Sequence, residues 1–396
     1  MQVMKMQVMK QKVTVQKVTV QEQTSSFQSH ALSPQKTSPQ ENSQEHALKK
    51  QLPANKDNNS RNAARLFSQD NISSHALSRG SLKSSAIHQT TIEREIVICG
   101  HGVHSNQEVN LTIHPADANH GIVFLRTHLP NGIERVIEAK HNIVSATALC
   151  TVLGCQTSGS VSTVEHLMAA LTGAGIDNVL VEIDGAEMPI LDGSSERFIE
   201  AIDDAGIKQL SEPRRYLKVL KTIRVEHNGS YVELKPYDYG FRLDVEINFD
   251  TDVVGRQRLI ADLTPDYFRK EISRARTFGF MRDVERLWKA GYALGASLDN
   301  TVAIGEGAVI NPEGLRYPDE FVRHKVLDAI GDLALAGASI IGEYRGYCAG
   351  HSLNNAILTA LFADASNYTF IHQHARRDWG ASDRPAMAAA FGPDRN

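Results

Sequence analysis

One order of elements, a run of strands followed by helices, occurs twice from about Gln89 onward and limits the folds open to this chain. Strands are predicted where apolar and polar residues alternate, and helices where apolar residues recur at helical spacing between a Ser and a Gly. The predicted elements are strands at 91–100, 108–116, 121–127 and 178–184 with helices at 162–175 and 194–206, then strands at 216–227, 230–237, 241–249 and 340–350 with helices at 321–337 and 353–364. This order predicts two α+β domains of similar layout, as a duplicated ancestor would produce.

The composition indicates a folded protein. With 396 residues, 41% of them hydrophobic, the chain has room for two or three domains and a real core. The formal net charge of −4 gives no reason to expect nucleic acid as a partner. The four cysteines form no CxxC pair and indicate reduced thiols, and no apolar run approaches the ~20 residues of a membrane span. We therefore expect a soluble protein.

The first 88 residues differ from the rest of the chain. Two five-residue segments, MQVMK and QKVTV, each occur twice, and a stretch rich in Gln, Ser, Asn and Lys follows. Because so few large apolar side chains cannot offset the entropy of ordering, residues 1–88 are predicted to be a disordered, low-complexity extension. The long apolar segment of a secretory signal is missing, and a targeting role is the alternative to a dispensable extension. At the other end, residues 376–396 are predicted to be a loose tail.

The predicted helix at 321–337 carries an unusual row of polar residues. His324, Asp328 and Asp332 recur every four residues and so fall on one stripe, opposite an apolar arc. An amphipathic helix with its polar side in water would have this pattern. A metal site would have it too, because a His and a carboxylate one turn apart can bind one cation from the same side. This segment alone leaves both interpretations open.

Glu165 and His166 form a second candidate site, adjacent in an otherwise apolar frame. Burying a carboxylate there is costly unless it has a partner, which favours a role beside a metal. The structural alternative is a capping box, with Ser162 as the N-cap, Glu165 three residues later and His166 a core histidine.

Further candidates lie in other segments, and each also fits a purely structural role. His351 follows a glycine before a predicted helix, where it could act as a proton donor oriented by Asp332. Thr277 could donate a hydrogen bond to an oxyanion, with Phe278 shielding the site. Lys325 could hold an anionic substrate beside a metal.

Five motifs in fixed order carry a family resemblance: STVEHLMAAL, PILDGSS, RARTFGF, HKVLDAIGDLAL and GHSLNN. Together they resemble the zinc-dependent UDP-3-O-acyl-N-acetylglucosamine deacetylases of lipid A synthesis. The resemblance covers roughly residues 89–375. It implies an α+β fold of two similar βα sandwich domains, residues 89–211 and 212–375, with the active site between them.

The resemblance also implies a metal and a reaction. One Zn²⁺ per chain would be held by His166, His324 and Asp328, and Glu165 would be the general base that takes a proton from water. The N-acetyl group would be hydrolysed, and the products would be acetate and the free 2-amino sugar nucleotide. Cys150, in ATALCTVLG, matches a position near the family's site and is interpreted as a packing residue.

The remaining candidates receive roles by the same resemblance. Thr277 would help to hold the oxyanion, and His351, oriented by Asp332, would stabilise that charge and protonate the leaving amine. Lys325 would lie near the diphosphate of the substrate, and Phe278 would lie against the substrate.

An acyl-bearing substrate also needs an apolar passage, which the family builds from an insertion after RTFGF. The candidate lining here is Val284, Leu287, Ala296 and Leu298, although these residues fit ordinary core as well. The family's amino-terminal GVGLHSG appears as GHGVHSN, with Asn106 in place of a glycine. The path of this loop is therefore where the chain departs from the family pattern.

The resemblance implies a monomer in the bacterial cytosol, with transient contact with the inner membrane surface. Organellar targeting by the N-terminal extension is a minor alternative. Two other functions stay open. One is a zinc amidase that acts on a different N-acylated sugar or small molecule. The other is a non-catalytic scaffold of the same fold.

Overall fold

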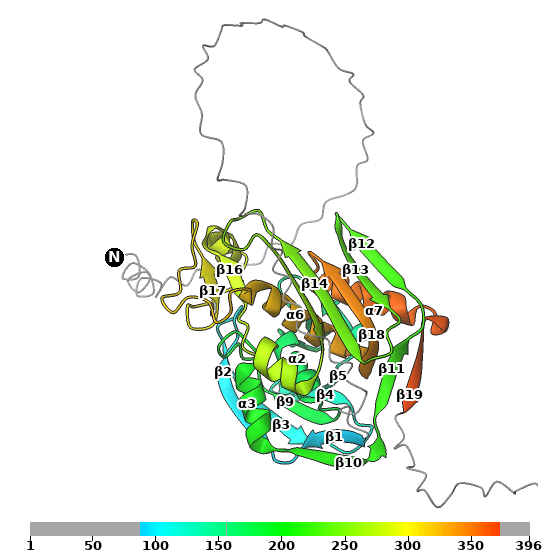
Figure 1. The fold of residues 1–396 in the computed structure, drawn as a ribbon. Helices are drawn as coiled ribbons and strands as arrows, with labels where there is room; N and C mark the ends of the chain where they lie inside the picture. The colour runs from blue at the N-terminus through cyan, green and yellow to red at the C-terminus, as the bar shows by residue number, and fades with distance from the viewer. Residues whose placement is uncertain (1–87, 156, 373–396) are drawn as a thin grey trace, which may run out of the picture. The chain divides into compact units, whose positions relative to one another are not determined.

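The computed structural model describes residues 88–155 and 157–372 (Figure 1). Of the extension predicted at 1–88, residues 1–87 lie outside the described part, and His88 begins the first strand. The tail predicted at 376–396 lies outside it as well. The α+β class is confirmed, because helices and several separate sheets make up the described chain.

The strands of the first half form three sheets. A five-stranded sheet has the order β2-β3-β9-β4-β5, a second has the order β6-β7-β8, and β1 pairs with β10. The elements are β1 (His88–Ile92), β2 (Ile96–His101), β3 (Glu108–Pro115), β4 (Ile122–Arg126), η1 (Pro130–Gly132), β5 (Arg135–Glu138), η2 (His141–Ile143), β6 (Val144–Ala146), β7 (Val152–Cys155), β8 (Gly159–Ser162), α2 (Glu165–Ala174), β9 (Val179–Ile183), α3 (Glu196–Ala205) and β10 (Ile207–Pro213).

The second half has one large sheet and a small one. Seven strands form the large sheet, with the path β12-β13-β18-β11-β19 and with β14 joining β15 to β18, while β16 pairs with β17. The elements are β11 (Arg215–Val219), β12 (Ile223–His227), β13 (Ser230–Lys235), β14 (Phe241–Asn248), β15 (Arg256–Asp262), α4 (Pro265–Tyr267), η3 (Phe268–Ile272), β16 (Phe278–Phe280), η4 (Met281–Asp283), α5 (Val284–Lys289), β17 (Val302–Ile304), α6 (Glu320–Leu333), η5 (Ala334–Ala336), β18 (Ser339–Tyr347), α7 (His351–Phe362), η6 (Ala365–Asn367) and β19 (Tyr368–His372).

Each half contains a parallel strand pair whose crossover carries a long buried helix. In the first half β4 runs parallel to β9 and α2 lies between them in sequence. In the second half β14 runs parallel to β18 and α6 lies between them. Parallel neighbours require such a crossover connection, and its recurrence agrees with the predicted repeat. The domain limits at 89–211 and 212–375 stay a prediction.

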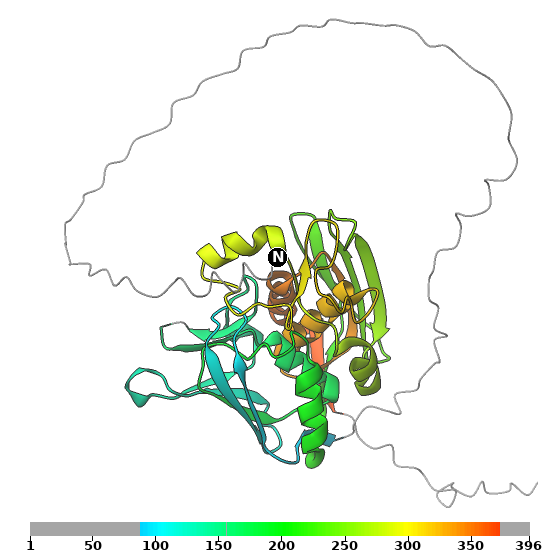
Figure 2. The ribbon, with the colours of Figure 1, turned by 90° about the vertical axis from the view of Figure 1, so that its left-hand side faces the viewer.

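Helices α2 and α6 pack against each other, and Figure 2 shows the helices between the strands of the two halves. Their approach is close at Gly331, where an added Cβ would stand 2.0 Å from the backbone carbonyl oxygen of Glu165. Only glycine avoids that overlap. Helix α6 is buried on nearly all sides, and His324, Asp328 and Asp332 are each at most 3% exposed. The interpretation of this row as a solvated face is therefore wrong.

Several predicted boundaries need correction. Helix α2 begins at Glu165 after Val164, and Ser162 ends β8, so the predicted capping box does not form. The reason is Thr163, whose φ of 59° turns the chain between strand and helix. His351 is the first residue of α7 rather than part of a preceding turn. The edge strand β19 was not predicted.

Candidate metal centre and active site

His166, His324 and Asp328 meet at the contact between α2 and α6, with one ligand atom of each within 4.8 Å of the others. His324 Nε2 stands 3.4 Å from Asp328 Oδ1, and His166 Nε2 stands 3.8 Å from the same oxygen. Two ligands about 2.0–2.1 Å from one tetrahedral ion lie about 3.3 Å apart, so these spacings fit a shared divalent cation. The structure thus brings together the three residues that the sequence analysis named as ligands.

The two imidazoles are in the form that binds metals. Burial lowers the pKa of His166 to about 3 and also lowers the pKa of His324, so both rings are neutral near pH 7. His324 Nδ1 donates to the carbonyl oxygen of Ala275 over 3.0 Å, which leaves the lone pair on Nε2. For His166, the Ser195 hydroxyl donates to the backbone carbonyl over 2.8 Å, while the buried Nδ1 has no partner among the described residues.

Asp328 is held as a carboxylate. Burial would raise its pKa, but His324 and Lys325 outweigh burial and place the pKa well below its usual range. Lys325 Nζ donates to Asp328 Oδ2 over 2.7 Å, and this carboxylate raises the pKa of the lysine although burial lowers it. Lys325 therefore stays charged beside the cluster, and its ammonium lies 5.5 Å from the centre of the Phe278 ring. Two neutral nitrogens and one anionic oxygen are a donor set suited to zinc.

Glu165 lies next to the cluster and has the properties of a base. Its side chain is 3% exposed, and its Oε2 accepts a hydrogen bond from the Thr151 amide over 3.1 Å. Burial, with Asp332 and Asp328, raises the pKa of Glu165 to about 7 although His351 opposes the shift. A carboxylate with a pKa near neutrality is suited to general base catalysis.

His351 faces Glu165 from the other half of the chain. Its Nε2 stands 3.7 Å from Glu165 Oε1, and its Nδ1 donates to Asp332 Oδ2 over 2.8 Å. Burial would lower the pKa of His351, but Asp332 and Glu165 outweigh burial and raise it to about 10. The ring therefore carries a proton on Nε2 near neutral pH, and that proton points toward the base and the metal ligands.

Thr277 and Phe278 lie in the segment that also holds the His324 ring. The Thr277 amide donates to the carbonyl oxygen of Gly193 over 2.8 Å, while its hydroxyl has no hydrogen-bond partner in the described chain. Phe278 makes edge contacts with Phe321 at 5.0 Å and with His324 at 6.3 Å between ring centres. A free hydroxyl and an aromatic ring thus flank the ligands.

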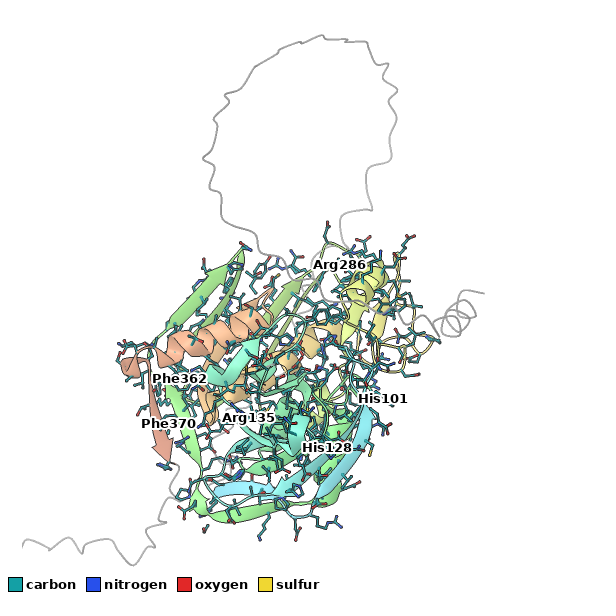
Figure 3. All side chains as sticks on the ribbon, turned by 180° about the vertical axis from the view of Figure 1, so that it is seen from behind. His101, His128, Arg135, Arg286, Phe362 and Phe370 are labelled. Carbon is teal, nitrogen blue, oxygen red and sulfur yellow. The ribbon has the colours of Figure 1, made fainter. Side chains whose placement is uncertain are left out.

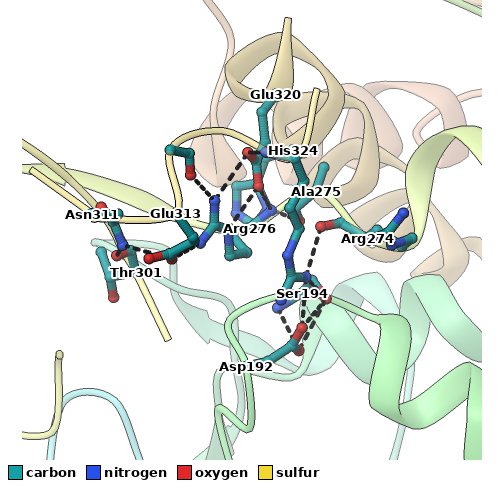
Figure 4. Close-up of polar contacts among 12 residues, drawn as sticks. Asp192, Ser194, Arg274, Ala275, Arg276, Thr301, Asn311, Glu313, Glu320 and His324 are labelled. Atoms are coloured by element: carbon teal, nitrogen blue, oxygen red, sulfur yellow. Dashed lines mark hydrogen bonds and ion pairs between the residues drawn. The ribbon is translucent and has the colours of Figure 1, made fainter. Parts of the chain in front are cut away.

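A buried ion pair behind the ligands was missed by the sequence analysis (Figure 4). Arg276 is 2% exposed and Glu320 is fully buried, and the backbone N and Nε of Arg276 donate to Glu320 Oε1 over 3.0 and 2.9 Å. Arg276 follows Ala275, and Glu320 lies one helical turn before His324. The pair therefore fixes the carbonyl oxygen of Ala275 against the ring that it orients.

A second bridge joins the PILDGSS segment to the same region. Arg316 Nη1 donates to Asp192 Oδ2 over 2.7 Å and to the carbonyl oxygen of Arg274 over 2.9 Å. The Arg316 amide donates to Glu320 Oε2 over 2.6 Å. The loop that supplies Ser195 to the carbonyl of His166 is thus tied to the segment that orients His324.

Thr151 and Asn354 are polar site residues that the sequence analysis also missed. The Thr151 hydroxyl donates to Asp332 Oδ1 over 2.6 Å, and Asn354 Nδ2 donates to Asp332 Oδ2 over 2.8 Å. Both stand within quoted motifs, Thr151 beside Cys150 and Asn354 in GHSLNN, and that position was the available signal. Cys150 is buried, and burial raises the pKa of its thiol to about 12.

A buried His–His–Asp cluster beside a carboxylate and a His–Asp pair defines the class of metal-dependent hydrolases. Residues 89–363 match the LpxC family, described as UDP-3-O-acyl N-acetylglycosamine deacetylase, and the chain belongs to this family. The UDP-3-O-acyl-N-acetylglucosamine deacetylase of Brucella ovis is 49% identical over 285 residues, which are 72% of this chain and 98% of the relative. The enzyme of the same name from Brucella melitensis is 48% identical over the same shares. The family resemblance is confirmed.

Among the described residues, no helix has both the length and the apolar character that crossing a bilayer would need.

Proposed function

We propose that this chain hydrolyses the N-acetyl group of UDP-3-O-acyl-N-acetylglucosamine, an early step of lipid A synthesis. The products are acetate and UDP-3-O-acyl-glucosamine. The observation that carries the proposal is the convergence of His166, His324 and Asp328 beside Glu165, in a chain 49% identical to enzymes of that name. One Zn²⁺ per chain is part of the proposal and is supported by the two neutral imidazoles and the carboxylate.

A divalent ion held by these ligands supplies a Lewis acid for the amide carbonyl and makes a nearby water more acidic. Glu165 accepts a proton from the attacking water, because its pKa of about 7 leaves much of it ionised at neutral pH. The oxygen of this water forms a bond to the acetyl carbon. Thr151 holds the base in position by donating its amide hydrogen to Oε2.

His351 donates its Nε2 proton to the leaving amine as the bond between carbon and nitrogen breaks. Asp332 fixes the opposite ring nitrogen over 2.8 Å, so the proton to be donated is on the side of Glu165. Before that step the protonated His351 ring stabilises negative charge on the acetyl oxygen, and the Thr277 hydroxyl donates a hydrogen bond to this oxygen. At the end one proton from water lies on Glu165 and the proton from His351 lies on the amine.

Substrate contacts are proposed for Lys325 and Phe278. Lys325 keeps its charge next to Asp328 and is partly exposed, so it can also attract the diphosphate. Phe278 presents a half-buried ring beside this ammonium. Lys325 already contacts Asp328, and Phe278 already contacts His324.

The segment after β16 is proposed to guide the acyl chain. All four predicted lining residues are half-buried and lie outside the buried core of the described chain, namely Val284, Leu287, Ala296 and Leu298. Around them Met281, Trp288 and Leu294 are exposed, and Arg286 of α5 points outward at the periphery (Figure 3). Exposed apolar side chains in one segment suit contact with a hydrocarbon chain.

Two wider statements belong to the same proposal. The two halves of the chain, residues 89–211 and 212–375, act as the two domains between which the site lies, as the separate strand pairing of each half supports. The enzyme acts as a monomer in the bacterial cytosol and contacts the inner membrane surface transiently, since its substrate carries an acyl chain.

Acetate release from UDP-3-O-acyl-N-acetylglucosamine, followed with and without a chelator, tests the function. We expect release that stops on chelation and returns on adding Zn²⁺. Asp328→Asn should lose stoichiometric metal and activity, while Asp266→Asn, at the exposed start of α4, is the matched control and should keep both. A folded, zinc-loaded protein that releases no acetate would refute the proposal.

A second function, a zinc amidase for another N-acylated sugar, would use the same residues. Simple N-acetyl sugars compared with the UDP-linked acylated substrate separate the two. Equal kcat/KM for both would favour the amidase, because the diphosphate and the acyl chain would then contribute no binding energy. A preparation that binds no metal would instead favour the scaffold.

A further inference from the structure

We propose that Thr151 is a positioning residue that holds the base of the first half and the acid of the second half in register. The inference rests on the proposed deacetylation and adds a residue to it. Thr151 directly precedes β7 and is 1% exposed. It donates to Glu165 through its amide and to Asp332, the hydrogen-bond partner of His351, through its hydroxyl.

The first contact is made by the backbone. The Thr151 amide donates to Glu165 Oε2 over 3.1 Å, within the same half of the chain. A side-chain substitution at position 151 leaves this bond in place. The carbonyl of Thr151 is tied too, because it accepts from the Val164 amide, directly before the helix that carries Glu165.

The second contact is made by the side chain and joins the halves. The Thr151 hydroxyl donates to Asp332 Oδ1 over 2.6 Å, across 181 residues of sequence. The other oxygen of Asp332, Oδ2, accepts from His351 Nδ1 and from Asn354 Nδ2, each over 2.8 Å. Thr151 is thus the one recorded donor to Oδ1 among the described residues, and its removal leaves that buried oxygen without a partner.

The fixed orientation of Asp332 matters because Asp332 accepts the hydrogen bond from Nδ1 of His351 and so turns Nε2 toward Glu165. Behind Asn354 stands the Tyr344 hydroxyl, which donates to Asn354 Oδ1 over 2.5 Å, so this side of the carboxylate is already braced. Without the Thr151 hydroxyl the carboxylate can rotate about its bond to Cβ. The ring of His351 would then lose its alignment with the leaving amine, while the metal ligands would keep theirs.

The charged and titratable groups around His351 are unchanged by a substitution of Thr151. Those groups are Asp328, Asp332 and His324 of α6, Glu165 and His166 of α2, and His104 of the loop after β2. Thr151→Val removes only a hydroxyl at nearly constant volume. Any effect on proton donation therefore reports position rather than a lost charge.

The experiment compares Thr151→Val, Thr151→Ser and the control Thr127→Val in the full-length, zinc-loaded chain. Thr127 is buried as well, and its hydroxyl donates to the carbonyl of Ile183 over 3.3 Å, away from the site. For Thr151→Val we expect kcat to fall by about 10- to 100-fold, the usual range for outer partners of a site, with KM and zinc content unchanged. Thr151→Ser should restore kcat to within a few fold, and Thr127→Val should leave it unchanged.

A measurement without turnover separates this inference from the proposed function. NMR measures how fast the Nδ1 proton of His351 exchanges with water in the metal-free protein. This exchange should be several-fold faster in Thr151→Val than in wild type, and the exchange rate in Thr127→Val should equal that of wild type. If Thr151→Val does not fold, the same faster exchange is expected of Thr151→Ala. Unchanged kcat and unchanged exchange in a folded variant, or failure of Ser to restore either, would overturn the assignment. Inactivity of the wild type refutes the proposed function but leaves the exchange result decisive.

Discussion

Replacing Gly331 by alanine should separate the two helices that carry the metal ligands. The added Cβ would lie 2.0 Å from the backbone oxygen of Glu165, and real Cβ contacts essentially never fall below 3.0 Å. Helix α2 must therefore move from α6 by at least about 1 Å, because the obstacle is backbone and cannot rotate away. His166, the next residue, would move with it.

The expected cost differs between stability and catalysis. Overpacking a core costs about 1–3 kcal/mol, and alanine in a helix returns about 1 kcal/mol relative to glycine, so the net loss is about 0–2 kcal/mol. A misplacement of about 1 Å can cost about 100-fold in rate. Gly331→Ala should thus stay folded, bind zinc more weakly and lose about 100-fold in kcat/KM.

The assay measures acetate release, zinc affinity and thermal unfolding together. Gly173→Ala is the matched control, because it also overpacks α2, but against the Phe268 side chain at 2.3 Å and near the other end of the helix. We expect the control to be destabilised while keeping zinc affinity. If Gly331→Ala retains kcat/KM within threefold, the argument from helix spacing is refuted.

Four further outcomes are expected. The kcat/KM profile should be bell-shaped. It rises as Glu165 loses its proton, below the metal-free pKa of about 7, because a bound cation favours the carboxylate. It falls as His351 deprotonates, below the metal-free pKa of about 10, because the same cation disfavours the imidazolium. A rate still rising above about pH 10 would contradict the acid assignment. Glu165→Gln and His351→Ala should keep zinc, measured by metal analysis, and each lose about 10²–10⁴-fold in kcat. Asp328→Ala should lose zinc in a chelator competition, and full affinity would exclude ligation. Glu320→Gln removes the buried carboxylate partner of Arg276 and leaves only the exposed Glu313, so unfolding in denaturant should show a loss of up to about 3–5 kcal/mol and zinc should bind more weakly.

The site was predictable where its geometry is local. The four-residue spacing of His324, Asp328 and Asp332 places them on one helix face in any helix, and the structure has them so. Spacing could not decide whether that face meets water or α2, because burial depends on the packing of both halves. His166 was a candidate because it adjoins Glu165 in an apolar frame, and the family resemblance decided between a ligand and a core histidine.

Contacts between distant segments could not be predicted from one sequence. Thr151 and Asp332, or Arg276 and Glu320, are ordinary residues until the fold brings them together. The wrong helix start at Ser162 has a different cause. The left-handed backbone of Thr163 is uncommon for a β-branched residue and is imposed by the tertiary structure rather than by local preference.

The position of the proposed ligands at the contact between α2 and α6 would give a bound metal a second effect. An ion bound by His166 on one helix and by His324 and Asp328 on the other would be a reversible cross-link between the two halves of the polypeptide. Free zinc at 100 times its dissociation constant would add about 2.7 kcal/mol to the free energy of unfolding. The melting temperature of this enzyme should therefore rise with the zinc supply, and starvation for zinc should expose the chain to proteolysis as well as stop its turnover.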